Sequence, residues 1–348
     1  MKTIGYASHS ATEELVPYHF ERRDLRPNDV SIEILYSGVC HSDLHTLHGD
    51  WGPQPYPLVP GHEIVGKVLE VGTAVKKYKT GDHVAVGCMV DSCQDCDQCG
   101  HSEEQFCRNG FTATYGSKDR TTGKITQGGY SKHIVVREEF VLSVPEKLDL
   151  SKAAPILCAG ITTYSPLKKW NVGKGTRVGV IGLGGLGHMG VKLAVALGAE
   201  VTVISRSKDK EASAKALGAK GILASSDEAA MAKAASSFDF ILDTVPVKHD
   251  FNTYTPLLDV DGALVLVGQI GPMEEPMTFP LVFGRRRIAG SLIGGIKETQ
   301  EVLDFCAEHN IHPECEMIEM GGINKAWDSL AKSNPSHRFV IDMSTLNL

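Results

Sequence analysis

The sequence predicts an α/β protein with a β-rich N-terminal part and a doubly wound parallel sheet in its second half. Two observations lead to this prediction. Short runs of β-branched residues, broken by turn residues, recur in the first part of the chain, and residues 177–207 follow the order strand, glycine-rich turn, helix, strand. The chain has 348 residues, enough for two domains at about 150 residues per domain.

Residues 177–207 have the order of a βαβ unit. Residues 178–181 form a short strand-like run, a helical pattern follows and closes at Gly198, and a second strand spans 201–204. The turn between strand and helix contains Gly182, Gly184, Gly185, Leu186 and Gly187. Such glycines allow a tight turn, close approach of backbone N–H groups to a pyrophosphate, and close packing of helix on strand. The segment therefore predicts dinucleotide binding rather than a glycine-rich surface loop.

The end of the second strand indicates which dinucleotide is bound. An Asp or Glu there would accept hydrogen bonds from the ribose 2′-OH of NAD. This chain instead has Ser205, Arg206 and Ser207, followed by Lys208 and Lys210. Hydroxyl and cationic groups suit a 2′-phosphate, so the sequence favours NADP(H). The alternative is an ordinary solvated basic turn.

Composition excludes several classes of partner. The net charge is −7, and 42% of the residues are apolar and 22% charged, which is ordinary for a globular protein and does not indicate nucleic-acid or membrane binding. Residues 1–7 lack the apolar core of a signal peptide, and no run reaches the ~18 apolar residues of a membrane helix. We therefore expect a cytoplasmic protein.

Four of the nine cysteines form a compact motif. Cys93, Cys96, Cys99 and Cys107 have the spacing C-x2-C-x2-C-x7-C, and four thiolates match a closed structural zinc site. An iron–sulfur cluster is the alternative, but ferredoxin runs with x2 spacings end in x3-C-P, whereas Arg108 follows the last cysteine here. The zinc would hold together a polar lobe, residues 91–108.

The N-terminal part also contains residues suited to a catalytic metal. Strand-like runs at 30–34 and 65–71 predict an all-β N-terminal domain. Between them lie Cys40 and His62, whose thiolate and imidazole are ligand types that zinc prefers. A catalytic zinc needs a third protein ligand, for which Cys158 is the candidate. From the residues alone, a buried structural cysteine is an equal alternative for Cys158.

These motifs resemble those of the zinc-dependent medium-chain alcohol dehydrogenases, and most closely their cinnamyl alcohol dehydrogenase branch, which includes bacterial aldehyde reductases. The matching segments are GVCHSDLH at 38–45, PGHEIVG at 60–66, the four-cysteine lobe, QGGYSKHIVV at 127–136, LCAGITTYSPL at 157–167, GLGGLGHMGVK at 182–192, DTVPV at 243–247 and GSLIGGIKETQE at 290–301. The resemblance implies a GroES-like catalytic domain formed by 1–162 and 292–348, and a Rossmann domain formed by 163–291.

The resemblance also assigns roles at the catalytic metal. It implies that Cys40, His62 and Cys158 bind the catalytic zinc and that Glu63 is a carboxylate able to approach it. Asp43 corresponds to the partner that orients the ligating imidazole. Ser42 and His45 correspond to a proton relay. With the four-cysteine site, the resemblance implies two zinc ions per chain.

Further positions correspond to the family's cofactor and substrate sites. The implied cofactor residues are His41 at the pyrophosphate, Thr162 beside the nicotinamide, the glycine turn, Val267, and Ser205, Ser207 and Lys210 at the 2′-phosphate. Arg206 departs from the serine usual in plant members. Arg338 corresponds to a position near the cofactor phosphates, with a surface arginine as the alternative. Trp51 and Met89 correspond to the walls of the substrate pocket, and the loop 108–120 differs from the plant sequences.

The function implied is reversible hydride transfer between NADP(H) and aromatic or medium-chain primary alcohols and aldehydes. One alternative is an NAD-dependent polyol or secondary-alcohol dehydrogenase, and another is a non-catalytic protein on the same fold.

Near the C-terminus, residues 298–307 predict an amphipathic helix ending around Asn310, and residues 337–342 predict a closing strand. The resemblance implies a homodimer through edge-to-edge pairing of Rossmann sheets, around 264–267 and 288–293.

Overall fold

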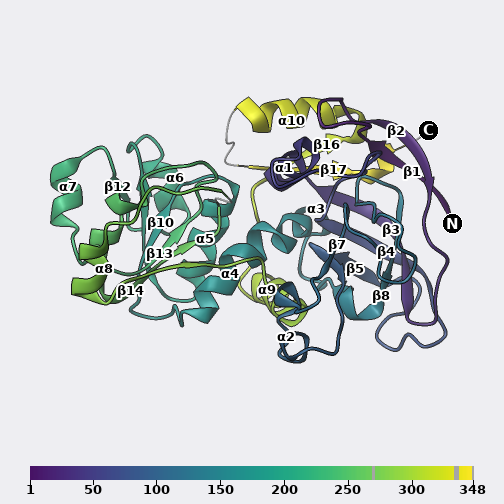
Figure 1. Ribbon diagram of the computed structural model, residues 1–348, viewed down its shortest axis with the longest axis horizontal. Coiled ribbons are helices and arrows are strands. Elements are labelled where there is room, and N and C mark those ends of the chain that lie inside the picture. Colours follow the sequence, from purple (N-terminus) through teal and green to yellow (C-terminus); the bar gives the residue numbers. More distant parts are fainter. Residues whose placement is uncertain (269–270, 333–336, 347–348) are drawn as a thin grey trace. The chain divides into compact units, whose positions relative to one another are not determined.

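The computed structural model describes residues 1–268, 271–332 and 337–346, and the chain divides into two compact units (Figure 1). The first unit comprises Met1–Ile161 and Gly294–Leu348, and the second comprises Thr162–Ile293. The second unit was expected to span 163–291.

The first unit is mainly β structure. Its strands are β1 (Lys2–Ala7), β2 (Val16–Glu21), β3 (Asp29–Gly38), β4 (Ile64–Val71), β5 (His83–Val86), β6 (Met89–Asp91), β7 (Thr112–Ala113), β8 (His133–Arg137), β9 (Leu142–Ser143), β16 (Cys315–Glu319) and β17 (Arg338–Asp342). Its α-helices are α1 (His41–His48), α2 (Asp97–Gly100), α3 (Leu150–Ala153), α9 (Ile296–Glu308) and α10 (Ile323–Lys332), and α4 (Ala159–Lys169) continues into the second unit. Short 3-10 helices are η1 (Glu104–Phe106), η2 (Glu138–Phe140), η3 (Ala154–Leu157), η6 (Met320–Gly322) and η7 (Met343–Thr345).

The strand β3 is the centre of the main sheet of this unit. The seven strands follow the order β16-β17-β3-β4-β5-β9, and β8 also pairs with β3. The strands expected at 30–34 and 65–71 are confirmed as parts of β3 and β4. The expectation of an all-β domain is wrong in one important place, because helix α1 follows β3 directly and carries several of the expected site residues.

The C-terminal segment completes the same sheet. The expected amphipathic helix and closing strand are confirmed as α9 and β17, and β17 pairs antiparallel with β3 through Val340 and Gly38. At the start of α9 the chain packs closely on the cysteine-rich lobe: a Cβ added at Gly295 would lie 1.7 Å from the Ser102 carbonyl oxygen. Only glycine fits there.

The second unit alternates strands and helices. Its strands are β10 (Arg177–Ile181), β11 (Glu200–Ser205), β12 (Ile222–Ala224), β13 (Phe238–Asp243), β14 (Leu258–Leu266) and β15 (Arg287–Gly290). Its remaining helices are α5 (Gly185–Ala196), α6 (Glu211–Ala216), α7 (Glu228–Lys233), α8 (Thr278–Gly284), η4 (Phe251–Thr253) and η5 (Thr255–Leu257).

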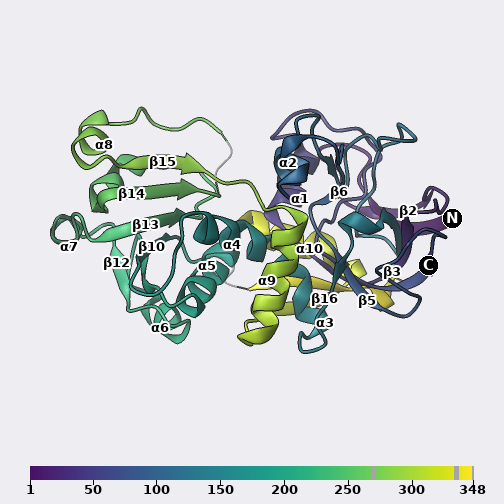
Figure 2. The same ribbon diagram turned by 90° about the horizontal axis from the view of Figure 1, so that it is seen from below.

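All six strands of the second unit run parallel, in the order β12-β11-β10-β13-β14-β15 (Figure 2). This order confirms the predicted doubly wound sheet. The strand order reverses between β10 and β13, and ligands of such sheets bind at the carboxyl ends of the strands at this switch point. One detail of the prediction is wrong: residues 264–267 cannot form a sheet edge, because β14 pairs with β13 on one side and β15 on the other.

Within the described residues, no helix combines the length and apolar character needed to cross a membrane.

Candidate metal centres and cofactor site

The carboxylate of Asp43 organises the first site. Asp43 is fully buried in α1, and its Oδ2 accepts hydrogen bonds from the Cys40 backbone N–H at 3.0 Å and the Tyr130 hydroxyl at 2.9 Å. Its Oδ1 accepts from the Gly61 backbone N–H at 3.1 Å and from Nδ1 of His62 at 3.0 Å. A buried carboxylate needs such donors to offset its lost hydration. Because Nδ1 of His62 donates to this carboxylate, Nε2 remains as the nitrogen that can bind a metal.

Four side chains converge beside this carboxylate. Ligand atoms of Cys40, His62, Glu63 and Cys158 all lie within 4.8 Å of one another, and all four residues are buried. The Sγ atoms of Cys40 and Cys158 are 3.8 Å apart. Two thiols and one imidazole are the donors that zinc prefers, and three protein ligands leave one position open. The three ligands named from the sequence therefore lie together in the structure, and they fit a zinc ion.

The two thiols of this cluster share the charge unequally. A hydrogen bond from Cys158 holds the pKa of Cys40 well below its usual value, and the same hydrogen bond raises the pKa of Cys158. Burial alone would lower the pKa of His62, but the Asp43 carboxylate raises it above the usual value. Two adjacent thiolates repel each other, and a divalent cation between them removes that repulsion.

Glu63 is the fourth member of the cluster and is paired with Arg338. Arg338 Nη2 donates to Glu63 Oε1 inside the protein, while Glu63 Oε2 is buried without a hydrogen-bond partner among the described residues. Burial raises the pKa of Glu63 to about 7, against the opposing effect of Arg338. The alternative of a surface arginine on the closing strand is wrong, because Arg338 is only 7% exposed. Its proximity to cofactor phosphates stays a prediction.

The expected relay residues lie on α1. Nδ1 of His45 is 2.8 Å from Oδ2 of Asp50, and a carboxylate only accepts, so Nδ1 carries the proton. The His45 ring also lies against Trp51, with ring centroids 5.4 Å apart. The backbone carbonyl of Ser42 accepts a hydrogen bond of 3.5 Å from the Tyr115 hydroxyl. The His41 side chain contacts α10: its Nε2 is 3.0 Å from the Leu330 carbonyl oxygen. Burial lowers the pKa of His41.

Sequence reasoning missed four residues of this site. Tyr130 hydrogen-bonds to Asp43, and Asp50 hydrogen-bonds to His45. The centroid of the Tyr115 ring lies 6.0 Å from that of the His62 ring. The Cys88 thiol donates to the carbonyl of Leu157, the residue before Cys158, at 3.6 Å. Asp50 follows the end of α1, where helical periodicity no longer applies, and Tyr130 lies 87 residues from its partner. No local sequence signal identifies these pairs. Met89 follows Cys88 and is buried at the start of β6.

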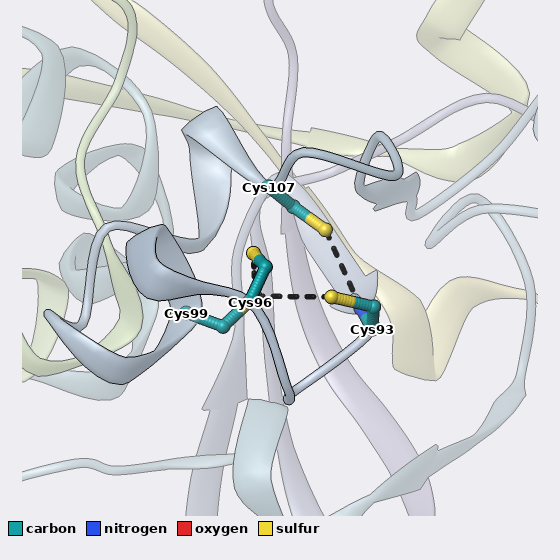
Figure 3. Close-up of side chains that lie close together, drawn as sticks. All are labelled: Cys93, Cys96, Cys99 and Cys107. Atoms are coloured by element: carbon teal, nitrogen blue, oxygen red, sulfur yellow. Dashed lines mark hydrogen bonds between the residues drawn. The ribbon is translucent and has the colours of Figure 1, made fainter.

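The second metal site is the four-cysteine lobe shown in Figure 3. Ligand atoms of Cys93, Cys96, Cys99 and Cys107 all lie within 4.8 Å of one another, with Sγ–Sγ distances of 3.5 Å for Cys96–Cys99 and 3.9 Å for Cys93–Cys99. The described residues of this cluster include no fifth His, Asp or Glu ligand, which is the closed arrangement of structural zinc sites.

Backbone amides prepare the lobe for thiolates. The N–H of Cys93 donates to Cys107 Sγ at 3.5 Å, and the N–H of Arg108 donates to Cys96 Sγ at 3.4 Å. Hydrogen bonds of this kind from the backbone at Cys99 and Arg108 lower the pKa of Cys96 to about 6. The backbone amides therefore favour the thiolate at Cys96 and Cys107, whereas a hydrogen bond with Asp95 raises the pKa of Cys93 to about 12 and burial raises that of Cys99.

The glycine turn lies at the end of β10, at the switch point of the second unit. Gly182 has φ +88°, which residues with a Cβ rarely adopt, and a Cβ at Gly187 would lie 2.2 Å from the Gly182 carbonyl oxygen. Gly184 is the N-cap of α5, and Gly185, Leu186 and Gly187 form its first turn. The start of α5 thus packs directly on the turn, in the geometry that presents backbone N–H groups to a pyrophosphate.

The expected 2′-phosphate residues follow β11. Ser205 ends the strand, and Arg206, Ser207 and Lys210 are exposed beyond it. The Ser226 hydroxyl donates to the Arg206 carbonyl at 2.7 Å, and the Ser207 hydroxyl donates to Asp209 Oδ2 at 2.8 Å. Two other predicted cofactor residues lie elsewhere in the second unit: Thr162 is buried in α4, and the N–H of Val267 donates to the Asp243 carbonyl at 3.0 Å.

Two family models match the chain. The model of the alcohol dehydrogenase GroES-like domain matches residues 26–146, and that of the zinc-binding dehydrogenases matches residues 185–308. These ranges contain Cys40, His62, the cysteine lobe and most of the dinucleotide-binding unit.

Full-length relatives agree with these matches. The NADP-dependent alcohol dehydrogenase C 1 of Mycolicibacterium smegmatis is 52% identical over 349 residues, with 99% of each chain covered. A cinnamyl alcohol dehydrogenase from Sorghum bicolor superposes with a TM-score of 0.95 at 42% identity, covering 99% of this chain and 98% of that one. The structure described as CAD from Helicobacter pylori complexed with NADP(H) has a TM-score of 0.89 at 43% identity, with 99% of each chain covered.

The arrangement around Asp43 leads to a test. Asp43→Asn replaces a carboxylate that accepts four hydrogen bonds with an amide whose NH₂ faces donors, so His62 loses its fixed orientation. We expect a 10- to 100-fold loss of zinc affinity, roughly the effect of removing a partner of a metal-binding histidine. Competition with a chromogenic zinc chelator measures it. Asp328→Asn, an exposed change on α10, is the control. Unchanged zinc retention in Asp43→Asn would show that Asp43 does not orient His62.

Proposed function

Because the chain belongs to the zinc-dependent medium-chain alcohol dehydrogenases, in their cinnamyl alcohol dehydrogenase-like branch, we propose that it transfers hydride reversibly between NADP(H) and aromatic or medium-chain primary alcohols and aldehydes. The observation that carries this proposal is the pair of distinct metal sites within the first unit. The lobe gathers four thiols, as closed structural sites do, whereas Cys40, His62 and Cys158 offer three ligands and leave a fourth position open.

The residues of the open site have complementary tasks. When bound there, zinc supplies a Lewis acid that polarises the substrate oxygen. Asp43 holds His62 in the tautomer that presents Nε2 to the metal, and the thiols of Cys40 and Cys158 supply its charge balance. Arg338 holds one carboxylate oxygen of Glu63, and an oxygen of Glu63 lies within 4.8 Å of the other ligand atoms, so Glu63 could serve as a further ligand to a bound metal.

A proton must also move between substrate and solvent. Ser42 is the proposed first carrier, because a hydroxyl donates and accepts at once, and His45 is the proposed link to water. Asp50 supports this role, since it fixes the proton of His45 on Nδ1 and leaves Nε2 available for transfer. The His45 side chain is 36% exposed, which gives the relay access to bulk water.

NADP(H) is the proposed cofactor. Ser205, Ser207 and Lys210, with Arg206, supply hydroxyl and cationic groups at the end of β11. The Mycolicibacterium relative is named NADP-dependent and the Helicobacter structure contains NADP(H), which supports the same cofactor here. Ser207 now donates to Asp209, so we propose that a bound 2′-phosphate takes over that hydroxyl. His41, Thr162, Val267 and Arg338 complete the proposed cofactor residues.

Apolar residues of the first unit suggest the substrate class. Trp51 lies against His45, and Met89 follows Cys88, which lies beside Cys158. Both suit aromatic or medium aliphatic aldehydes better than polyols. Two apolar residues give only limited selectivity, since one methylene group contributes about 1–3 kcal/mol of discrimination.

We also propose a homodimer that forms along the β15 edge of the second unit. Strand β15 pairs only with β14 among the described strands, and Figure 2 shows α8 near this side of the sheet. On α8 the side chains of Phe279, Val282 and Phe283 are 68%, 71% and 76% exposed. Apolar side chains gathered in this way beside an open sheet edge favour a second copy that covers both.

A cytoplasmic location is proposed because the zinc-binding cysteines must remain reduced.

The third zinc ligand is tested by Cys158→Ala. We expect the loss of one of two zinc ions per chain and a fall in benzaldehyde reduction of at least about 10²-fold, since Lewis-acid catalysis contributes several kcal/mol. Metal analysis and initial rates with NADPH measure both. Cys315→Ala, in β16 outside both clusters, is the control and keeps both ions. Full activity in Cys158→Ala would contradict the assignment.

The cofactor assignment is tested by Ser207→Asp. A carboxylate at the end of β11 repels a 2′-phosphate and can accept from a ribose hydroxyl, so we expect the ratio of kcat/KM for NADPH to that for NADH to fall about tenfold or more. Ser213→Asp places the same charge on the exposed face of α6 as a control. Wild-type protein that uses NADH as well as NADPH would instead favour the NAD-dependent polyol or secondary-alcohol dehydrogenase.

The dimer is tested by Phe283→Glu. A charge at this exposed position would be buried against the second copy, so we expect a shift from dimer to monomer in light scattering coupled to size-exclusion chromatography. Val16→Glu, at an apolar position on β2 in the first unit that is 41% exposed, should leave the dimer intact. A monomeric wild-type protein would refute the proposal.

A further inference from the structure

We propose that Asp243 and His249 form a proton-dependent clip that positions the loop after β13 against the glycine turn, so that dinucleotide affinity depends on His249 carrying both ring protons. The inference rests on the proposed dinucleotide binding of the second unit. His249 is thereby a positioning residue, since it acts through the loop and not by touching the cofactor.

The geometry of His249 fixes its protonation. Nε2 lies 2.8 Å from Oδ2 of Asp243, and Nδ1 lies 2.8 Å from the Val247 carbonyl oxygen. Both partners are acceptors, so both ring nitrogens must donate, and only the imidazolium carries two N–H groups. The other oxygen of Asp243 accepts from the Val245 N–H at 3.1 Å, as expected of an ionised carboxylate. The pair therefore closes a loop of seven residues, 243–249.

This loop supports the glycine turn directly. The backbone N–H and the hydroxyl of Thr244 both donate to the Ile181 carbonyl, at 3.1 and 2.7 Å. A Cβ added at Gly182 would lie 3.0 Å from Thr244 Oγ1, and one at Gly187 would lie 3.3 Å from the same atom. The loop and the turn are thus in van der Waals contact at the switch point. A loop that moves away from this position removes the support of the turn that approaches the pyrophosphate.

The charges around His249 favour the imidazolium. Two carboxylates are close to His249 in the chain: Asp243 at the end of β13 and Asp250 just before η4. The Tyr254 ring lies edge-on to the His249 ring, with centroids 6.0 Å apart. The neighbouring cation, Lys248, is paired with Glu274 at 2.9 Å. The hydrogen bond to Asp243 raises the pKa of His249 above its ordinary value, with burial opposing it. Burial raises the pKa of Tyr254, so Tyr254 stays neutral, and Arg206 is the cation that acts on Tyr254 from the end of β11.

The sign of the effect follows from the raised pKa. The clip is fully formed below the ordinary histidine pKa of about 6.5 and is lost as pH rises through the raised pKa of His249. Dinucleotide affinity should therefore contain a component that decreases toward alkaline pH.

The test is the dissociation constant of NADPH between pH 6 and pH 9.5, measured by nucleotide fluorescence for wild type, His249→Gln and His309→Gln. His309 is an exposed histidine at the end of α9 and serves as the matched control. At pH 6 we expect His249→Gln to bind roughly 3- to 10-fold more weakly than wild type, a fraction of the effect of a charge-assisted hydrogen bond. The ratio should approach one at high pH, and the control ratio should stay near one throughout.

Comparing proteins at the same pH cancels the titration of the NADPH phosphate itself. A ratio of one at pH 6, or a ratio that is large and equal at every pH, overturns the clip. A second measurement uses wild type alone: the two-bond ¹H–¹⁵N spectrum at pH 6, assigned with His249→Gln, should show a doubly protonated ring. A neutral ring refutes the proposal.

Failure of the proposed cofactor is distinguishable. If wild type binds NADH but not NADPH, the cofactor proposal is wrong, whereas the same series with NADH still tests the clip, because both nucleotides share the pyrophosphate.

Discussion

The buried carboxylate of Asp43 is the constraint on which the catalytic site depends. Its four hydrogen bonds join the start of α1, the backbone at Gly61, the ring of His62 and the hydroxyl of Tyr130. These groups come from three separate parts of the chain, around residues 40, 61 and 130, and the carboxylate holds them together in space. Removing one partner from such a network leaves buried polar groups unsatisfied, at about 1–3 kcal/mol each. The ligand geometry is therefore coupled to the packing of the whole unit.

The discontinuous first unit follows from the same site. Glu63 is buried and needs a cation, and Arg338 supplies it from β17, near the other end of the chain. Pairing of β17 with β3 places Arg338 there, and β3 ends at Gly38, where a Cβ would lie 1.9 Å from Glu63 Oε2. The chain thus returns to its first sheet because the site uses residues from both ends. A side chain at position 38 would displace the carboxylate.

Local patterns predicted much of this molecule. The glycine turn and the four-cysteine lobe are defined by short spacings, because a turn and a small chelate loop constrain neighbouring residues directly. Helix α1 was missed because its buried face includes the polar residue Asp43, so it shows no simple apolar periodicity. The interior position of β14 was missed because strand order depends on which strands pair across the sheet, and nothing within residues 264–267 encodes it. Tyr130 was missed because it lies 87 residues from Asp43 and no spacing rule links such distant partners, and Asp50 was missed because it lies beyond the end of α1, outside its helical periodicity.

The two histidine–aspartate pairs show how one interaction serves two purposes. In both, a buried carboxylate accepts from a ring nitrogen, from His62 at 3.0 Å and from His249 at 2.8 Å. The difference lies at the second nitrogen. For His62 that nitrogen faces two thiols and Glu63, a cluster suited to a cation, so a bound metal replaces the second proton. For His249 it faces the Val247 carbonyl, which can only accept, so the proton stays and the ring becomes a cation itself. The environment of one nitrogen therefore decides whether the pair binds a metal or closes a loop.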